Sequence, residues 1–137
     1  MLDDVLEAPP DAVRTRSCSF WIDGFLHARF HDGAEVTAAD ARENLAASWT
    51  LNGEKAGPVL VDLRRIRSQS AEARAVLAGP EATPVCNVVA LIIGSPISRV
   101  IGNFFLGFNR PAAPTRLFTS VEDARAWVYE MRAMTNV

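Results

Sequence analysis

The chain has 137 residues, of which 49% are hydrophobic and 22% are charged, and its formal net charge is -2. This length and balance predict one globular domain with a substantial core, and the charge gives no electrostatic basis for nucleic-acid binding. The first ten residues, MLDDVLEAPP, are acidic where a secretory signal would be basic, and Cys18 and Cys86 lie in apolar runs that favour buried free thiols. A cytoplasmic location is therefore expected.

The chain is expected to begin with a flexible N-terminal arm at 1–12, which contains a Pro-Pro pair and several acids, followed by a single domain at 13–137. A β-hairpin opens that domain, because Asp23-Gly24 lies between two alternating apolar runs and suits a two-residue type I′ turn. Six side chains of the hairpin are expected to share one face: Cys18, Phe20, Ile22, Leu26, Ala28 and Phe30.

Helix and strand signals then alternate along the chain. Thr37 and Asp40 form a variant capping box that predicts the start of a first long helix. A short apolar strand is predicted at 59–63. Ser68 or Ser70 is expected to cap a second helix, which a Gly-Pro pair ends.

The stretch 88–108 has few charges and is rich in Val, Ile, Leu and Phe. A membrane-spanning helix needs about 20 mostly apolar residues, but a Gly-Ser-Pro turn at 94–96 interrupts this stretch. It therefore predicts a buried strand followed by a helix from Pro96 to about Phe108, and no membrane span. On a helical wheel six large side chains of this helix gather into one arc that should pack on a sheet. These are Ile97, Val100, Ile101, Phe104, Phe105 and Phe108.

The last elements are a short strand in TRLF, at 115–118, and a helix for which Thr119 and Glu122 form a capping box. The whole order is a hairpin followed by three helix–strand repeats and a final helix. Such alternation predicts an α/β fold with a mixed, mainly parallel sheet of about five strands, an N-terminal β-hairpin and about four helices. The long helices should lie mostly on one face of the sheet.

Three stretches resemble the STAS domain in its small, single-domain SpoIIAA-like form. GPVLVDLRRIRSQS is similar to the strand, Asp-Leu pair and serine-started helix of anti-sigma factor antagonists. VVALIIGSP resembles the next buried strand with its helix, and RLFTSVEDARAWV resembles the closing strand and helix. The resemblance covers roughly residues 13–133 and implies a SpoIIAA-like fold.

The same resemblance implies a non-catalytic regulatory or protein-interaction module, with an anti-sigma factor or kinase-like regulator as the partner class. In the antagonists a phosphorylatable serine lies in an Asp-Ser-Ser/Thr-Gly turn at the head of the helix. Here Arg67 replaces the acid and the glycine is missing, so Ser68 and Ser70 match that serine by location only. Both serines are candidate phosphorylation sites.

No residues assemble into a predicted catalytic or metal site, and no cofactor is expected. His27 and His31 are four apart on a strand, so they should lie about 13 Å from each other at about 3.3 Å per residue, too far to share a zinc ion. Both histidines are expected to be exposed. Ser95 follows a glycine but lacks the Gly-x-Ser-x-Gly pattern of a nucleophile elbow and is better explained as a helix cap. The chain is therefore not expected to be an enzyme.

The polar residues that follow the two apolar strands form one candidate binding site. Helix N-termini favour anions, and ligands often bind at the carboxyl ends of parallel strands. These residues therefore predict a site for an anionic ligand or for an acidic loop of a partner. The alternative is two ordinary helix caps beside exposed arginines. The candidate residues are Arg64, Arg65, Arg67, Ser95 and Ser98. The alternative function is accordingly a small-molecule binding domain for an anionic or lipid-like ligand.

A second candidate site is an interface formed by Phe105, Leu106 and Trp127. A sheet covers only one side of a helix, so some of these side chains are expected to remain exposed and to mediate homodimer formation or partner docking. The alternative is simple core packing. A pocket lined by Phe104, Phe105 and Phe108 would instead favour the ligand-binding function.

Overall fold

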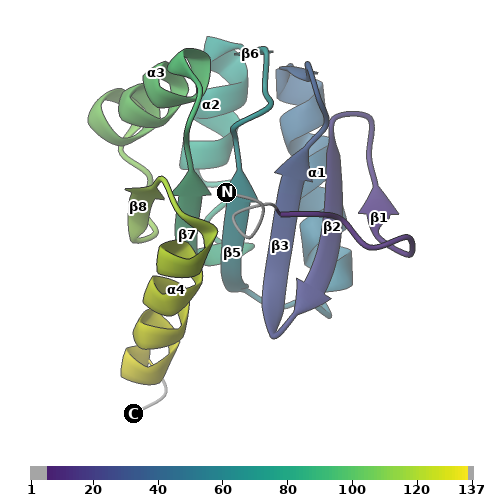
Figure 1. The fold of residues 1–137 in the computed structure, drawn as a ribbon, viewed down its shortest axis with the longest axis vertical. Helices are drawn as coiled ribbons and strands as arrows, with labels where there is room; N and C mark the ends of the chain where they lie inside the picture. The colour runs from purple at the N-terminus through teal and green to yellow at the C-terminus, as the bar shows by residue number, and fades with distance from the viewer. Residues whose placement is uncertain (1–5, 136–137) are drawn as a thin grey trace.

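The computed structural model describes residues 6–135, which form a six-stranded sheet with helices on both faces (Figure 1). The spatial order of the strands is β1-β2-β3-β5-β7-β8. Their bounds are β1 (Val13–Arg14), β2 (Cys18–Asp23), β3 (Phe25–Phe30), β5 (Gly57–Asp62), β7 (Cys86–Ile92) and β8 (Thr115–Phe118). The pairs β1–β2 and β2–β3 are antiparallel and the remaining pairs are parallel. The predicted mixed, mainly parallel α/β fold is confirmed.

The described residues also form four α-helices and one π-helical turn, and the last helix follows the final strand. They are α1 (Ala38–Leu51), α2 (Ala71–Ala78), α3 (Pro96–Phe104), the π-helical turn η2 (Phe105–Asn109) and α4 (Val121–Thr135). A separate parallel pair, β4 (Glu35–Val36) with β6 (Ser68–Gln69), joins the loops that precede α1 and α2. The first three helices cover one face of the sheet and α4 covers the other (Figure 1).

The sheet therefore separates two apolar cores. The first core lies under α1, α2 and α3, and the second core lies under α4. In β5, Val59 contributes to the first core and Leu60 to the second, because successive side chains point to opposite faces. Central parallel strands that are covered on both faces are apolar almost throughout, as β5 and β7 are here.

The N-terminal hairpin turns more tightly than the predicted two-residue loop. Asp23 pairs with Phe25, which leaves Gly24 alone at the apex with φ +77°. A Cβ on Gly24 would also overlap the hydroxyl of Tyr129 in α4, so glycine is needed there for two reasons. The predicted shared face is otherwise correct, except that Ile22, beside the turn of the hairpin, is 48% exposed.

Side-chain caps define where the helices begin. The Thr37–Asp40 capping box of α1 is present as predicted, and Ser70 caps α2 by accepting the N–H of Ala73. The expected capping box of Thr119 with Glu122 is wrong by one residue, since α4 begins at Val121 and Ser120 Oγ accepts the Asp123 N–H. The shift occurs because β8 continues through Phe118, whose carbonyl accepts the Ile93 N–H.

Two expectations concern the N-terminal arm and the apolar stretch. Residues 1–5 of the arm lie outside the described residues, whereas Leu6 is buried in the second core, so the arm is anchored at that point. The stretch 88–108 is part of β7 followed by α3 and most of η2, as predicted. Among the helices that the structure describes, none has the length and apolar character needed to cross a membrane.

Candidate functional site

Helix α3 exposes a row of large apolar side chains. Ile97 is 47%, Val100 60%, Phe104 47% and Phe108 75% exposed. Their spacing of three or four residues places them on one side of α3 and η2, and the Phe104 and Phe108 ring centroids are 5.5 Å apart. We call these four residues the α3 stripe.

The predicted apolar arc is thus rotated away from the sheet, and small residues cause the rotation. Ser98 and Gly102 lie outside the arc, yet both are buried against the protein. A Cβ on Gly102 would lie 3.0 Å from a methyl carbon of Leu117, tighter than an ordinary contact, so glycine favours this close approach of α3 to the sheet. Of the six arc residues only Ile101 and Phe105 are buried, and the other four form the α3 stripe. The sequence signal that could have shown this orientation of α3 is the pair of small residues Ser98 and Gly102, four positions apart.

The predicted interface of Phe105, Leu106 and Trp127 is wrong in its composition. Phe105 is 7% exposed and belongs to the first core. Trp127 is partly buried on the opposite face of the sheet, where its ring contacts Phe118 at a centroid distance of 5.6 Å. Leu106 is partly buried. The three residues cannot form one surface because the sheet lies between Phe105 and Trp127.

Basic side chains border the α3 stripe. The guanidinium of Arg74 in α2 lies over the Phe104 ring, 5.1 Å from its centroid, and its Nη1 donates to the Gln69 carbonyl at 2.8 Å. Arg99 and Arg110 are exposed on α3 and just beyond η2. The sequence from 82 to 121 contains no Asp or Glu at all. The segment that carries the stripe therefore presents apolar surface with positive charge.

The structure does bring the candidate anion site together, but its charges are largely compensated. The carboxyl ends of β5 and β7 are adjacent, and Arg64 packs beside Gly94 in the loop that precedes α3. Arg64 also forms a two-point ion pair with the buried Asp62, with N–O distances of 3.0 Å. Sequence reasoning missed this pairing because it depends on the turn after β5, in which the Arg64 backbone N–H also donates to Asp62 Oδ1.

The remaining side chains of that candidate site have separate contacts. Arg65 lies 3.6 Å from Asp32, and Arg67 is exposed. The hydroxyl of Ser98 donates to the carbonyl of Ser95 and accepts the backbone N–H groups of Gly94 and Ser95. Ser95 Oγ in turn accepts the Ser98 N–H and so caps α3. The Ser95–Ser98 contacts are those of a helix cap. Binding of an anion or an acidic partner loop at this edge stays a prediction.

The two candidate phosphorylation sites have different surroundings. Ser70 is partly buried and its hydroxyl caps α2. Ser68 is exposed in β6, where the strand pairs with β4. Phosphorylation of either serine stays a prediction.

His27 is fully buried, which corrects the expectation that both histidines are exposed. Its Nδ1–H donates to the Phe25 carbonyl at 2.9 Å, and its Nε2 accepts from Arg125 Nε–H of α4 at 3.3 Å. Burial lowers the pKa of the His27 imidazole below its usual value, so the ring is held neutral. In the described part of the chain, no group of three His, Cys, Asp or Glu side chains is placed to hold a metal ion.

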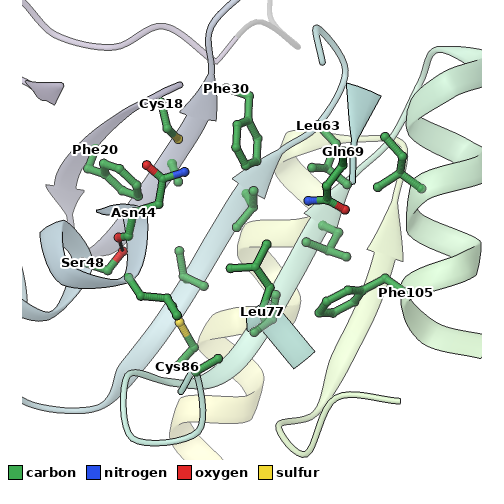
Figure 2. Close-up of a pocket in the computed structure, with 18 residues that line it drawn as sticks. Cys18, Phe20, Phe30, Asn44, Ser48, Leu63, Gln69, Leu77, Cys86 and Phe105 are labelled. Carbon is green, nitrogen blue, oxygen red and sulfur yellow. Dashed lines mark hydrogen bonds between the residues drawn. The ribbon is translucent and has the colours of Figure 1, made fainter. Parts of the chain in front are cut away.

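A cavity of about 90 Å³ lies in the first core, between the sheet and the helices (Figure 2). Phe105 and Ile101 of the α3–η2 segment line it, together with Gln69 of β6. Of the three rings proposed as pocket-lining residues, only Phe105 contributes; Phe104 and Phe108 are on the outer surface.

Comparison with known proteins identifies the fold and the family. No curated protein matches the sequence. The crystal structure of an uncharacterised DUF3478-family protein with a SpoIIAA-like fold, from Shewanella loihica PV-4, is similar with a TM-score of 0.57 and 15% identity, and the match covers 82% of this chain and 92% of that one. The predicted SpoIIAA-like fold is therefore confirmed, and at this identity the likeness extends to the fold alone. The model of the family "Domain of unknown function (DUF7793)" matches residues 20–132, and the chain belongs to this family.

Proposed function

We propose that this chain is a non-catalytic binding module that docks a partner protein on the α3 stripe. The observation that carries the proposal is the exposure of four large apolar side chains in a row along one helix. Single exposed apolar residues are ordinary on protein surfaces, but adjacent ones are typical of interaction sites. Gly102 packs closely against Leu117 and Ile93, so α3 lies on the sheet with the stripe facing outward.

The charge around the stripe indicates the chemistry of the partner. Arg74, Arg99 and Arg110 border or flank the apolar residues, and no acidic residue occurs from 82 to 121. Two copies of the chain joined stripe to stripe would bring these arginines together, which disfavours a symmetric dimer through this surface. A partner segment with both apolar and acidic side chains fits better, for example an amphipathic acidic helix.

The resemblance to anti-sigma factor antagonists supports the class of partner. We extend the proposal to an anti-sigma factor or kinase-like regulator, acting in the cytoplasm, where the free thiols of Cys18 and Cys86 would stay reduced. If such a regulator phosphorylates the chain, Ser68 is the better substrate, because it is exposed whereas the Ser70 hydroxyl is used as a cap.

Calorimetric titration with two designed amphipathic helices tests the proposal. Both peptides carry the same leucine face, and the polar face is glutamate in one and lysine in the other. We expect the glutamate peptide to bind at least about tenfold more tightly than the lysine peptide, because the arginines attract one and repel the other. Val100→Asp should weaken binding of the glutamate peptide by a similar factor, whereas Ala126→Asp, at an exposed position of α4, should not.

Several results would contradict the proposal. Equal binding of both peptides, or binding that Val100→Asp leaves unchanged, would exclude the stripe as an acid-selective docking site. A wild-type dimer that Val100→Asp converts to a monomer in light scattering would identify a second copy as the occupant. Binding to anionic lipid vesicles that Val100→Asp abolishes, without peptide binding, would identify a lipid surface instead.

A further inference from the structure

The cavity in the first core is enclosed almost entirely by apolar side chains. Residues of strands β2, β3, β5 and β7 line one side of it, and residues of α1, α2 and α3 line the other. Figure 2 shows these side chains. The apolar lining residues are Cys18, Phe20, Ala28, Phe30, Leu45, Val59, Val61, Leu63, Leu77, Ala82, Cys86, Val89, Leu91, Ile101 and Phe105. The remaining lining residues are Asn44, Ser48 and Gln69. Protein interiors are normally packed with few voids larger than a water molecule, so a space of about 90 Å³ is unusual.

The lining restricts the charge and the size of any occupant. None of the described residues around the cavity carries a formal charge, and burial raises the pKa of the Cys86 thiol to about 11 and that of Cys18 further still. An ionic ligand would have no partner there, and its burial would be strongly unfavourable. An engineered apolar cavity of about 150 Å³ binds benzene, so this smaller one, of about 90 Å³, admits at most one small ring.

One buried polar atom in the lining has no partner. The Oε1 of Gln69 is inaccessible to solvent and accepts no hydrogen bond, and Figure 2 shows the amide group directed toward the side of the cavity where Leu77 and Phe105 lie. Asn44, by contrast, donates to Ser17 Oγ at 2.9 Å and accepts from Thr15. Buried polar groups are nearly always hydrogen-bonded, so the unpaired oxygen is an acceptor that a donor on an occupant of the cavity can use.

A second, smaller hollow adjoins the cavity on the side of η2. This hollow of about 20 Å³ lies between the end of α2 and the loop at 111–113, and it shares Leu77, Ala82 and Phe105 with the cavity. The adjoining backbone is irregular: η2 is a π-helical turn, and Arg110 after it has φ +49°. Single π-helical turns occur often at functional sites.

We infer that the core cavity is a binding site for a small, uncharged, mostly apolar molecule with one hydroxyl group, such as a simple phenol. The apolar part of the molecule fills the space between Leu77, Ile101 and Phe105, and its hydroxyl donates to Gln69 Oε1. The site is separate from the α3 stripe, since Phe105 and Ile101 face inward while the stripe faces outward. The inference does not depend on the docking proposal.

Titration with phenol and toluene, followed by the chemical shifts of amide groups around the cavity, tests this inference. The two molecules have similar size and differ in the hydroxyl. Phenol should bind roughly five- to tenfold more tightly than toluene, which is the effect of about one hydrogen bond to a buried acceptor. In Gln69→Leu this preference should vanish, because no acceptor remains.

Cavity filling provides the second test. Ala82 lines the cavity, so the larger side chain of Ala82→Leu should fill part of it and abolish binding of both molecules. The control Ala126→Leu, at an exposed position of α4, should leave binding intact. Thermal unfolding of each variant verifies that it is folded. Failure of both molecules to bind the wild type up to their solubility would overturn the site. Equal affinity for phenol and toluene, or a phenol preference that survives in Gln69→Leu, would overturn the role of Gln69.

Discussion

His27 shows how a single buried residue connects the hairpin to α4. Its ring stacks on Phe25 at a centroid distance of 4.5 Å, and its two nitrogens bond to the Phe25 carbonyl and to Arg125. In the sequence His27 lies between Leu26 and Ala28, whose side chains were expected to face the core. Successive side chains of a strand point to opposite faces, so His27 was expected to be exposed. The prediction failed because α4 covers the other face, and that long-range packing leaves no local pattern near residue 27.

The buried imidazole should make stability depend on pH. Burial lowers the pKa of His27 in the folded protein below the ordinary 6.5 of the unfolded chain. As the pH falls, the unfolded state therefore binds a proton more readily than the folded state. Stability is therefore complete above pH 6.5 and decreases below it, by at most about 1.4 kcal/mol per pH unit. Urea unfolding between pH 7.5 and 5.5 should show this loss in the wild type and in His31→Phe. His27→Phe should be nearly flat over the same range, and a slope equal to that of the wild type would exclude His27 as the source.

At the level of elements, the caps of α1, α2 and α3 were predicted, the cap of α4 was wrong by one residue, and the orientation of α3 was not predicted. The start of α2 follows from a serine before a helix-forming run, which is a local property. The orientation of α3 is decided instead by how closely its backbone can approach Leu117 and Ile93. A helical wheel takes account of hydrophobicity but not of how closely small residues can pack. It therefore predicted that the α3 stripe packs on the sheet.

Ser70 and Ser68 form a matched pair for testing the cap. Ser70→Ala removes the oxygen that accepts the Ala73 N–H and should lower the free energy of unfolding by about 1 kcal/mol. Ser68→Ala changes an exposed side chain of β6 and should lie within about 0.5 kcal/mol of the wild type. Denaturant unfolding of both variants decides the matter, and equal losses would contradict the assignment of the cap.

At the scale of the whole molecule, the alternation of elements was enough to predict a mixed, mainly parallel sheet. Crossover connections between consecutive parallel strands follow from that order. The distribution of helices was predicted only in part, because nothing in the periodicity of 121–128 says which face α4 covers. The cavity was beyond sequence reasoning because it depends on how separate helices fit on one sheet, whereas the α3 stripe left one local sign, the small residues Ser98 and Gly102. Gln69, the polar residue of the cavity, belongs to a two-residue strand with no periodic signal.

The central claim, that the α3 stripe docks an acidic partner segment, is tested most directly by mapping where such a segment binds. The glutamate peptide is titrated into the labelled wild-type protein, and the chemical shift of every assigned amide is followed. We expect the largest changes along α3 and η2 and near Arg74, whose side chain lies over Phe104. Changes concentrated instead at Arg64, Arg65 and Arg67, beside the carboxyl end of β5, or on α4, would contradict it.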